Sequence, residues 1–335
     1  MTIAAFSKTV LAASLLAFLA PAAFAQQEVI VHSNLTDKSP QYQALLKFKE
    51  LVEERTAGAF EVKLFPNSAL GDDVEAAQQI QTGAIHAAPM PSAALSNFNP
   101  SLQLIDLPFL FPSREVTYEV LDSEEVGGRM LANLEQSGFV GASVWENGFK
   151  QMTCNHPVRQ PSDFEGRKVR VMQSPLLIAQ FEAVGAAAIP IAFPELYTAL
   201  QQGVVECQEN PLVTISVMRF FEVQDYLTLS NHGYLGSPFI FSKIWFDQLD
   251  ETTREVLLTS AREAGQVSRE LAAKRDVEIV AEIKAAGTTE IIELSDEERD
   301  AFAAAMRPVH EQFADRIGRE LLDAANAKIK ELSSN

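Results

Sequence analysis

The 335-residue sequence lacks the motifs that mark the common enzyme families. It contains no HExxH, no GxSxG, no GxxxxGK[ST] and no GxGxxG following a predicted strand. Its five histidines show no metal-ligand spacing, and no nucleophile is paired with a base. We therefore expect no catalytic residues, no metal and no cofactor. A secreted hydrolase is a remote alternative, which product formation from a bound acid would revive.

A run long enough for a membrane span is also missing at the N-terminus. The apolar run there covers 10–20, interrupted only by Ser14, and is followed by the small-x-small sequence Ala23-Phe24-Ala25. This pattern predicts a secretory signal peptide over 1–25, because the run is too short to cross a bilayer. An N-terminal core helix is the alternative. We expect the mature protein to be exported and soluble, without direct membrane insertion.

Basic residues are few. Once 1–25 are removed, 26 lysines and arginines face 45 acidic residues, which gives a net charge of −19. Phosphate backbones and anionic membrane surfaces bind basic faces, so we expect neither as a partner. A small anion can still bind, because local charge rather than net charge decides its affinity.

Cysteine is scarce, with only Cys154 and Cys207. In an oxidising compartment the two could form a disulfide that stabilises the fold by a few kcal/mol. Two free buried thiols are the alternative, because the sequence does not show that their Cα atoms approach each other. We favour the disulfide.

Strand and helix patterns alternate along the first part of the chain, which predicts an α/β fold with a parallel sheet. The expected strands are 29–32, 60–64, 84–90 and 140–145, with helices at 40–56 and 72–83. A second set follows, with strands at 151–153, 168–172 and 204–208 and helices at 175–184 and 194–202. Strands at 225–229 and 238–241 lead back. About 310 mature residues exceed one typical core, so we expect two lobes.

A long helix is predicted from Thr252, whose capping box includes Glu255, to about Lys284. At ~1.5 Å per residue it would span roughly 50 Å, enough to brace both lobes. Gly265 is a candidate kink. A last helix begins at Ser295 and bends near Pro308.

Arg170 lies on a strand predicted to be buried, Lys168-Val169-Arg170-Val171, and no acidic residue shares its strand face. A buried charge without a partner is expensive. Because a guanidinium pairs bidentately with a carboxylate, we expect its partner to be an organic acid ligand.

Other candidates surround this strand. Glu206, Glu209 and Asn210 lie at the carboxyl end of the next predicted strand, where ligands of α/β sheets bind. Asn210 suits a carboxylate or hydroxyl, although it could equally cap the helix that Pro211 opens. Phe193 could form an apolar wall, and Trp145 could line a cleft; core packing is the alternative for both.

Taken together, several segments resemble the DctP family, the periplasmic substrate-binding proteins of tripartite ATP-independent periplasmic (TRAP) transporters. They are FKELVEERT, LFPNSALGDD, LPFLF, WENGFKQMT, GRKVRV, FPELYTALQQGVVECQENP and FFEVQDYLTLSNH. The resemblance covers nearly the whole mature chain. It implies a binding protein without catalysis, located in the periplasm, that captures a small organic acid and delivers it to a TRAP membrane permease.

The resemblance also implies two α/β lobes around a cleft, linked by crossing strands and braced by the long helix. We expect lobe I to comprise 26–148 and 236–275, and lobe II to comprise 149–235 and 276–335. The family's carboxylate-binding arginine falls on Arg170, the supporting asparagine on Asn210 and the stacked aromatic on Phe193. Asn34 and Asp73 fall on positions that face the ligand from the first lobe.

Departures from the family bear on the ligand. Lys150 replaces an arginine found in many members, and Pro91 stands where sialic-acid binders place a glutamate. A C4-dicarboxylate needs two cationic anchors, which Lys150 and Arg170 would supply. A sugar acid needs one anchor and hydroxyl partners, for which Asp73, His32 and Glu146 are available. We favour the dicarboxylate. The cysteine pair is unusual for the family, which supports the disulfide.

Overall fold

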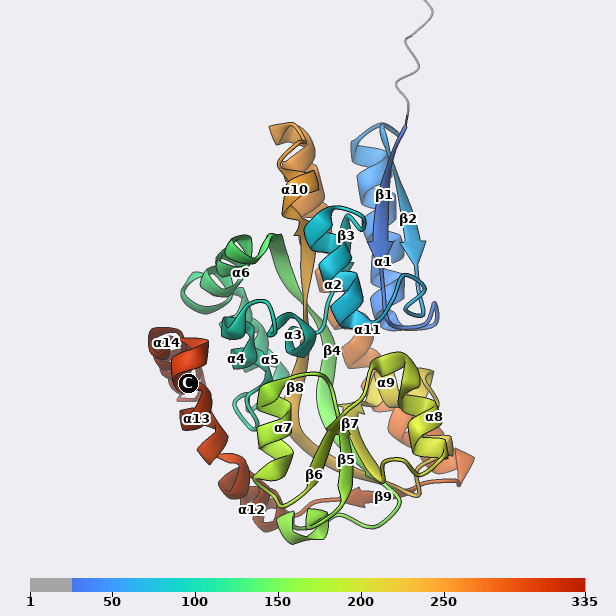
Figure 1. Cartoon of the computed structure of the whole chain (residues 1–335), viewed down its shortest axis with the longest axis vertical. Coiled ribbons are helices and arrows are strands. Elements are labelled where there is room, and N and C mark those ends of the chain that lie inside the picture. The colour runs from blue at the N-terminus through green and yellow to red at the C-terminus, as the bar shows by residue number, and fades with distance from the viewer. Residues whose placement is uncertain (1–25, 335) are drawn as a thin grey trace, which may run out of the picture.

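The computed structural model describes residues 26–334, which form a mixed α/β fold around one sheet of nine strands (Figure 1). The signal peptide predicted over 1–25 lies outside the described residues. Within 26–334, no helix has both the length and the apolar character that a membrane span requires.

The first lobe is built on three parallel strands in the order β2-β1-β3, which confirms the predicted βαβαβ unit. The strands are β1 (Gln27–His32), β2 (Phe60–Phe65) and β3 (Ala87–Pro89), and the crossover helices are α1 (Pro40–Arg55) and α2 (Asp73–Thr82). Leu45 of α1 packs with Val29 of β1, whereas Ala76 of α2 belongs to a separate core cluster. Helices therefore cover both faces of these strands.

The second lobe contains the parallel strands β7-β5-β6. They are β5 (Lys168–Val171), β6 (Ala187–Pro190) and β7 (Cys207–Pro211), with helices α7 (Pro175–Glu182), α8 (Leu196–Gln201) and α9 (Leu212–Val217). The sequence did not predict β6. β7 begins three residues after its predicted start, and Val205, inside the predicted strand, is buried in the core.

Two long strands join the lobes (Figure 1). β4 (Phe139–Cys154) has 16 residues, β8 (Tyr226–Ser242) has 17, and the two pair antiparallel through both halves of the sheet. The sequence predicts two short strands in place of each. Register shifts next to Gly148 and Lys150, and a left-handed φ of 45° at Asn231, interrupt the alternation while pairing continues.

Helix α11 (Glu251–Ala286) contacts α1 and β4 on one side and α9 on the other, so it braces both lobes as predicted. Its cap is Asp250 rather than Thr252, because Asp250 accepts the Thr253 N–H. The helix runs unbroken through Gly265. A Cβ there would lie 2.8 Å from Nε1 of Trp145, so close packing explains this glycine.

The C-terminal segment adds one strand and three helices. These are β9 (Glu290–Glu293), α12 (Asp296–Met306), α13 (Pro308–Ile317) and α14 (Arg319–Ser333). Ser295 caps α12, as predicted, and Pro308 starts a new helix. α14 packs on α5 (Arg114–Asp122), within the part assigned to lobe I, although 276–335 were assigned to lobe II. The lobe limits stay a prediction.

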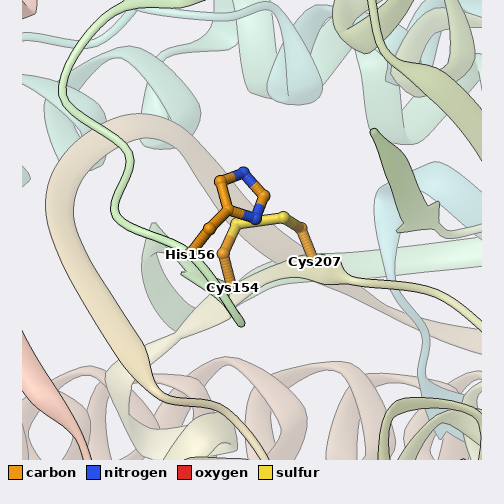
Figure 2. Close-up of side chains that lie close together, drawn as sticks. All are labelled: Cys154, His156 and Cys207. Carbon is orange, nitrogen blue, oxygen red and sulfur yellow. A yellow bond between two sulfur atoms is a disulfide. The ribbon is translucent and has the colours of Figure 1, made fainter. Parts of the chain in front are cut away.

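A disulfide joins Cys154 at the end of β4 to Cys207 at the start of β7 (Figure 2). The two residues are direct partners in the antiparallel ladder, with their Cα atoms 4.1 Å apart. The ring of His156 lies beside them, with its ligand atom within 4.8 Å of both sulfurs. Metals bind thiolates, and both sulfurs are joined to each other here, so this group carries no metal assignment.

We expect the Cys154→Ala/Cys207→Ala variant to lose stability. The disulfide closes a loop over a sequence separation of 53, and loop-closure entropy gives a loss of roughly 2–4 kcal/mol in the free energy of unfolding. Urea denaturation of the variant and of the oxidised protein measures the difference. Equal denaturation midpoints and slopes for the two proteins would show that the disulfide does not constrain the unfolded chain.

Candidate functional site

Arg170 is buried at the centre of β5, with 1% of the residue exposed. Its Nε donates a hydrogen bond of 3.0 Å to the carbonyl of Ile191, and among residues 26–334 no carboxylate lies within 4.0 Å of the guanidinium. Burial lowers the pKa of Arg170 to about 10, opposed by the charges of Asp73 and Glu209. The side chain is therefore a buried cation at neutral pH.

Phe193 and Asn210 lie near this cation. The guanidinium carbon of Arg170 is 5.9 Å from the ring centroid of Phe193, which is within cation–π distance. Arg170 pairs with Gln208 across β5 and β7, so Asn210, two residues further on, shares the same sheet face. Asn210 donates to Gln208 Oε1 at 2.5 Å.

The capping alternative for Asn210 does not hold. Pro211 occupies the N-cap of α9, and the cap has no side-chain hydrogen bond. Asn210 therefore sits at the carboxyl end of β7 with its side chain beside the predicted anchor, at an edge where α/β sheets bind ligands.

The first lobe contributes Asn34 and Asp73, both buried. Asn34 Nδ2 donates to Asp73 Oδ2 at 3.2 Å, whereas Asn34 Oδ1 and Asp73 Oδ1 have no hydrogen-bond partner among the described residues. Burial raises the pKa of Asp73 to about 7, although the nearby charge of Arg170 opposes the rise. The charges of Asp73 and Arg170 therefore act on each other, although the two residues come from different parts of the sheet.

His32, at the end of β1, is fully buried, and neither ring nitrogen has a hydrogen-bond partner within the described chain. Burial lowers its pKa to about 4, opposed by the charge of Asp72. The ring is therefore neutral at pH 7, and it offers one donor and one acceptor.

Lys150 is paired within the chain. Its Nζ lies 2.9 Å from Glu209 Oε1 and 3.6 Å from Asp106 Oδ1, with 1% of the side chain exposed. Asp106 ends the short helix α4 (Gln103–Asp106), so the contact joins residues from separate parts of the chain. The sequence predicts a second ligand anchor at Lys150, but its charge is already matched by two carboxylates.

Glu209 is the centre of this buried network. Its Oε2 accepts from His232 Nε2 at 2.7 Å and from Gln180 Nε2 at 3.3 Å, and His232 Nδ1 is 2.8 Å from the hydroxyl of Ser230. Burial raises the pKa of Glu209, but Lys150 and His232 outweigh it and lower the value to about 2. Burial lowers the pKa of His232, so a neutral ring donates to the carboxylate.

Two residues predicted near the ligand lie elsewhere. Trp145 is fully buried, packs against the ring of Phe239 and donates to the carbonyl of Ala261 on α11, so it packs the core rather than lining a cleft. Glu146 accepts hydrogen bonds from Arg114 and Tyr118 and is not free to bind hydroxyls. Both side chains instead secure the crossing strand β4.

Some buried polar groups after the strands of the second lobe were not predicted. The hydroxyls of Ser174 (before α7) and Thr214 (α9) are buried without hydrogen-bond partners in the described chain. Ser174 and Thr214 follow the carboxyl ends of β5 and β7, and this position was the one available clue in the sequence. Asn97 Nδ2 bonds the carbonyl of Gln173 at 2.7 Å, so the two lobes touch.

Comparison with known proteins gives consistent relatives. Residues 30–316 match the DctP model, described as bacterial extracellular solute-binding protein, family 7. The C4-dicarboxylate-binding periplasmic protein DctP of Rhodobacter capsulatus is 37% identical over 314 residues, covering 92% of this chain and 93% of that protein.

Solved structures agree in fold. A TRAP periplasmic solute binding protein from Shewanella oneidensis with bound succinate has a TM-score of 0.87 and 33% identity, covering 91% of this chain and 99% of that one. The sugar acid binding protein of Advenella mimigardefordensis in complex with galactonate has a TM-score of 0.88 and 34% identity, covering 91% and 98%.

Breaking the pair between Lys150 and Glu209 should destabilise the protein strongly. We expect Lys150→Met to lower the free energy of unfolding by about 3–5 kcal/mol, because it leaves a buried carboxylate without its cation. Arg167→Ala removes an exposed pair with Glu206 and should cost less than about 1 kcal/mol. Urea denaturation compares the two. Equal losses would contradict the buried-charge account.

Asp73 should make stability fall as pH rises. Between the ordinary carboxyl pKa of 3.8 and about 7, the folded protein retains a proton that the unfolded chain has lost. Asp73→Asn removes this term, so its stability relative to wild type should increase from pH 4 to pH 7 and level off above. Denaturation midpoints at one-unit pH steps measure it. A constant difference would place the ionisation of Asp73 outside this window.

Proposed function

The chain belongs to the DctP family, family 7 of the bacterial extracellular solute-binding proteins, and from this premise we propose that Arg170 captures the carboxylate of its ligand. One observation carries the proposal: a guanidinium with 1% exposure has no carboxylate within 4.0 Å among the described residues. A carboxylate ligand would supply the missing charge through two parallel hydrogen bonds.

The neighbours of Arg170 support this role. Asn210 would donate or accept a further hydrogen bond at the same carboxylate, and the Phe193 ring would pack against the carbon next to it. Asn34 and Asp73 approach from the first lobe, where they would contact the remainder of the ligand. His32, buried close to α2, would offer a neutral donor and acceptor.

Capture would be followed by closure of the two lobes, with β4, β8 and α11 as the connections that bend. Ligand shifts this equilibrium only by its greater affinity for the closed form. The closed protein would then deliver the acid to a TRAP membrane permease without chemical change. Export by residues 1–25 would place it in the periplasm as a soluble protein, as the names of its relatives support.

Two ligand classes remain in the proposal. The R. capsulatus relative is named for C4-dicarboxylates, and the A. mimigardefordensis structure contains galactonate, a sugar acid. Both carry a carboxylate for Arg170. They differ in what the rest of the cleft meets, either a second carboxylate near Lys150 or hydroxyl groups.

Arg170→Ala should abolish acid binding. We expect wild-type protein at a ligand concentration ~100-fold above Kd to gain roughly 2.7 kcal/mol of stability, and the variant to gain none. Thermal-shift screening with dicarboxylates, sugar acids and simple monocarboxylates, followed by calorimetry, measures both. Arg167→Ala, an exposed arginine three residues away, is the matched control and should bind normally. Undiminished binding by Arg170→Ala would overturn the proposal.

A further inference from the structure

A series of hydrogen bonds between buried side chains leads away from Asn210. Asn210 Nδ2 donates to Gln208 Oε1 at 2.5 Å, and Gln208 Nε2 donates to Thr153 Oγ1 at 2.8 Å. The hydroxyl of Thr153 donates to Gln224 Oε1 at 3.0 Å, and Gln224 Nε2 donates to Asn155 Oδ1 at 2.8 Å. We call Asn210, Gln208, Thr153 and Gln224 the Asn210 network. Each of the four is at most 3% exposed, so bulk water competes little with these bonds.

The backbone sets the direction of this network at the end remote from Asn210. Gln224 Nε2 also lies 3.1 Å from the carbonyl oxygen of Val223 and 3.4 Å from that of Glu206. Because a carbonyl oxygen only accepts, the NH2 group of Gln224 faces these carbonyls and its Oε1 accepts from Thr153. Every further member then donates in the same direction, so Asn210 takes part through its NH2 group.

The Asn210 network lies on the sheet face that carries Arg170. Gln208 is the ladder partner of Arg170 on β5 and of Thr153 on β4, and Asn210 follows two residues later on the same face. An NH2 group carries two hydrogens, and among residues 26–334 Asn210 Nδ2 donates to Gln208 alone. The second hydrogen suits a carboxylate, whose oxygens only accept. If the amide were flipped, an oxygen would replace this NH2 group and would repel a carboxylate.

We propose that Thr153 and Gln224 are positioning residues for ligand binding. Acting through Gln208, they hold the amide of Asn210 so that its second N–H donates to the carboxylate on Arg170. The inference rests on the proposed capture of a carboxylate by Arg170. It makes Asn210 a donor to that carboxylate, and it assigns the direction of the amide to two side chains that act through Asn210.

Calorimetry with succinate and galactonate, which two solved relatives contain, tests the network. Thr153→Val removes the hydroxyl, so the amides of Gln208 and Asn210 lose their fixed direction. We expect the Kd of each acid that binds wild type to rise about tenfold, because hydrogen bonds to charged groups are strong. Thr153→Ser keeps the hydroxyl and should stay within about twofold of wild type. Gln224→Met breaks the network from its other end and should raise the Kd about threefold or more.

A double-mutant cycle shows whether the hydroxyl acts through Asn210. In the Asn210→Ala background, Thr153→Val should change the Kd by less than about twofold, because the amide that the network directs is missing. Thr228→Val is the matched control. It removes another buried threonine hydroxyl of the sheet, which donates to the carbonyl of Val158 outside the network. This control should lower the urea denaturation midpoint, as Thr153→Val does, but leave the Kd unchanged.

The outcomes separate the two proposals. If Thr153→Val binds the acids as wild type does, the positioning role is overturned and carboxylate capture stands. If Thr153→Val weakens binding by the same factor with and without Asn210, the hydroxyl acts independently of the amide and the positioning role is again overturned. If Arg170→Ala binds as tightly as wild type, carboxylate capture fails and the inference fails with it.

Discussion

The rest of the structure depends on keeping one guanidinium dry and positively charged without giving it an internal carboxylate. β5 holds Arg170 between β6 and β7. The carbonyl of Ile191 accepts a hydrogen bond from Nε of Arg170, which fixes the direction of the guanidinium group. The nearest acidic groups, Asp73 and Glu209, act on its charge from beyond ion-pair distance. A rigid frame of this kind preserves the attraction for an external anion, because solvent screening is weak inside it.

Lys150, the second buried cation, differs from Arg170 because its charge is paired within the protein. Lys150 is neutralised by Glu209, and Glu209 is in turn held by His232 and Gln180. Glu209 and Asn210 are adjacent in β7, and their side chains lie on opposite faces of the sheet because side chains alternate along a strand. Glu209 faces the network that ties the lobes' crossing strands together, whereas Asn210 faces Arg170. The same strand, β7, therefore serves both stability and the proposed recognition.

The sequence was sufficient to predict the α/β pattern, the long helix and the burial of Arg170 without an internal carboxylate, because each depends on local periodicity or on a charge inside an apolar strand. The sequence was insufficient to predict that β4 and β8 are continuous. Bulges and the left-handed Asn231 interrupt the alternation of side chains, and the pairing between the two strands joins residues far apart in the sequence. The sequence also could not assign partners to Lys150: Glu209 and Asp106 are far along the chain, and only the tertiary fold brings them within reach.

Helix α11 has a mechanical consequence. Because one unbroken helix of 36 residues contacts α1 in the first lobe and α9 in the second, rotation of the lobes must bend it or slide it along one of them. For any ligand that makes no contact with α11, its bending stiffness enters the closing equilibrium as the same term. The helix would then change the affinity for all such acids by the same factor. The differences in affinity between acids would come from the residues that contact them.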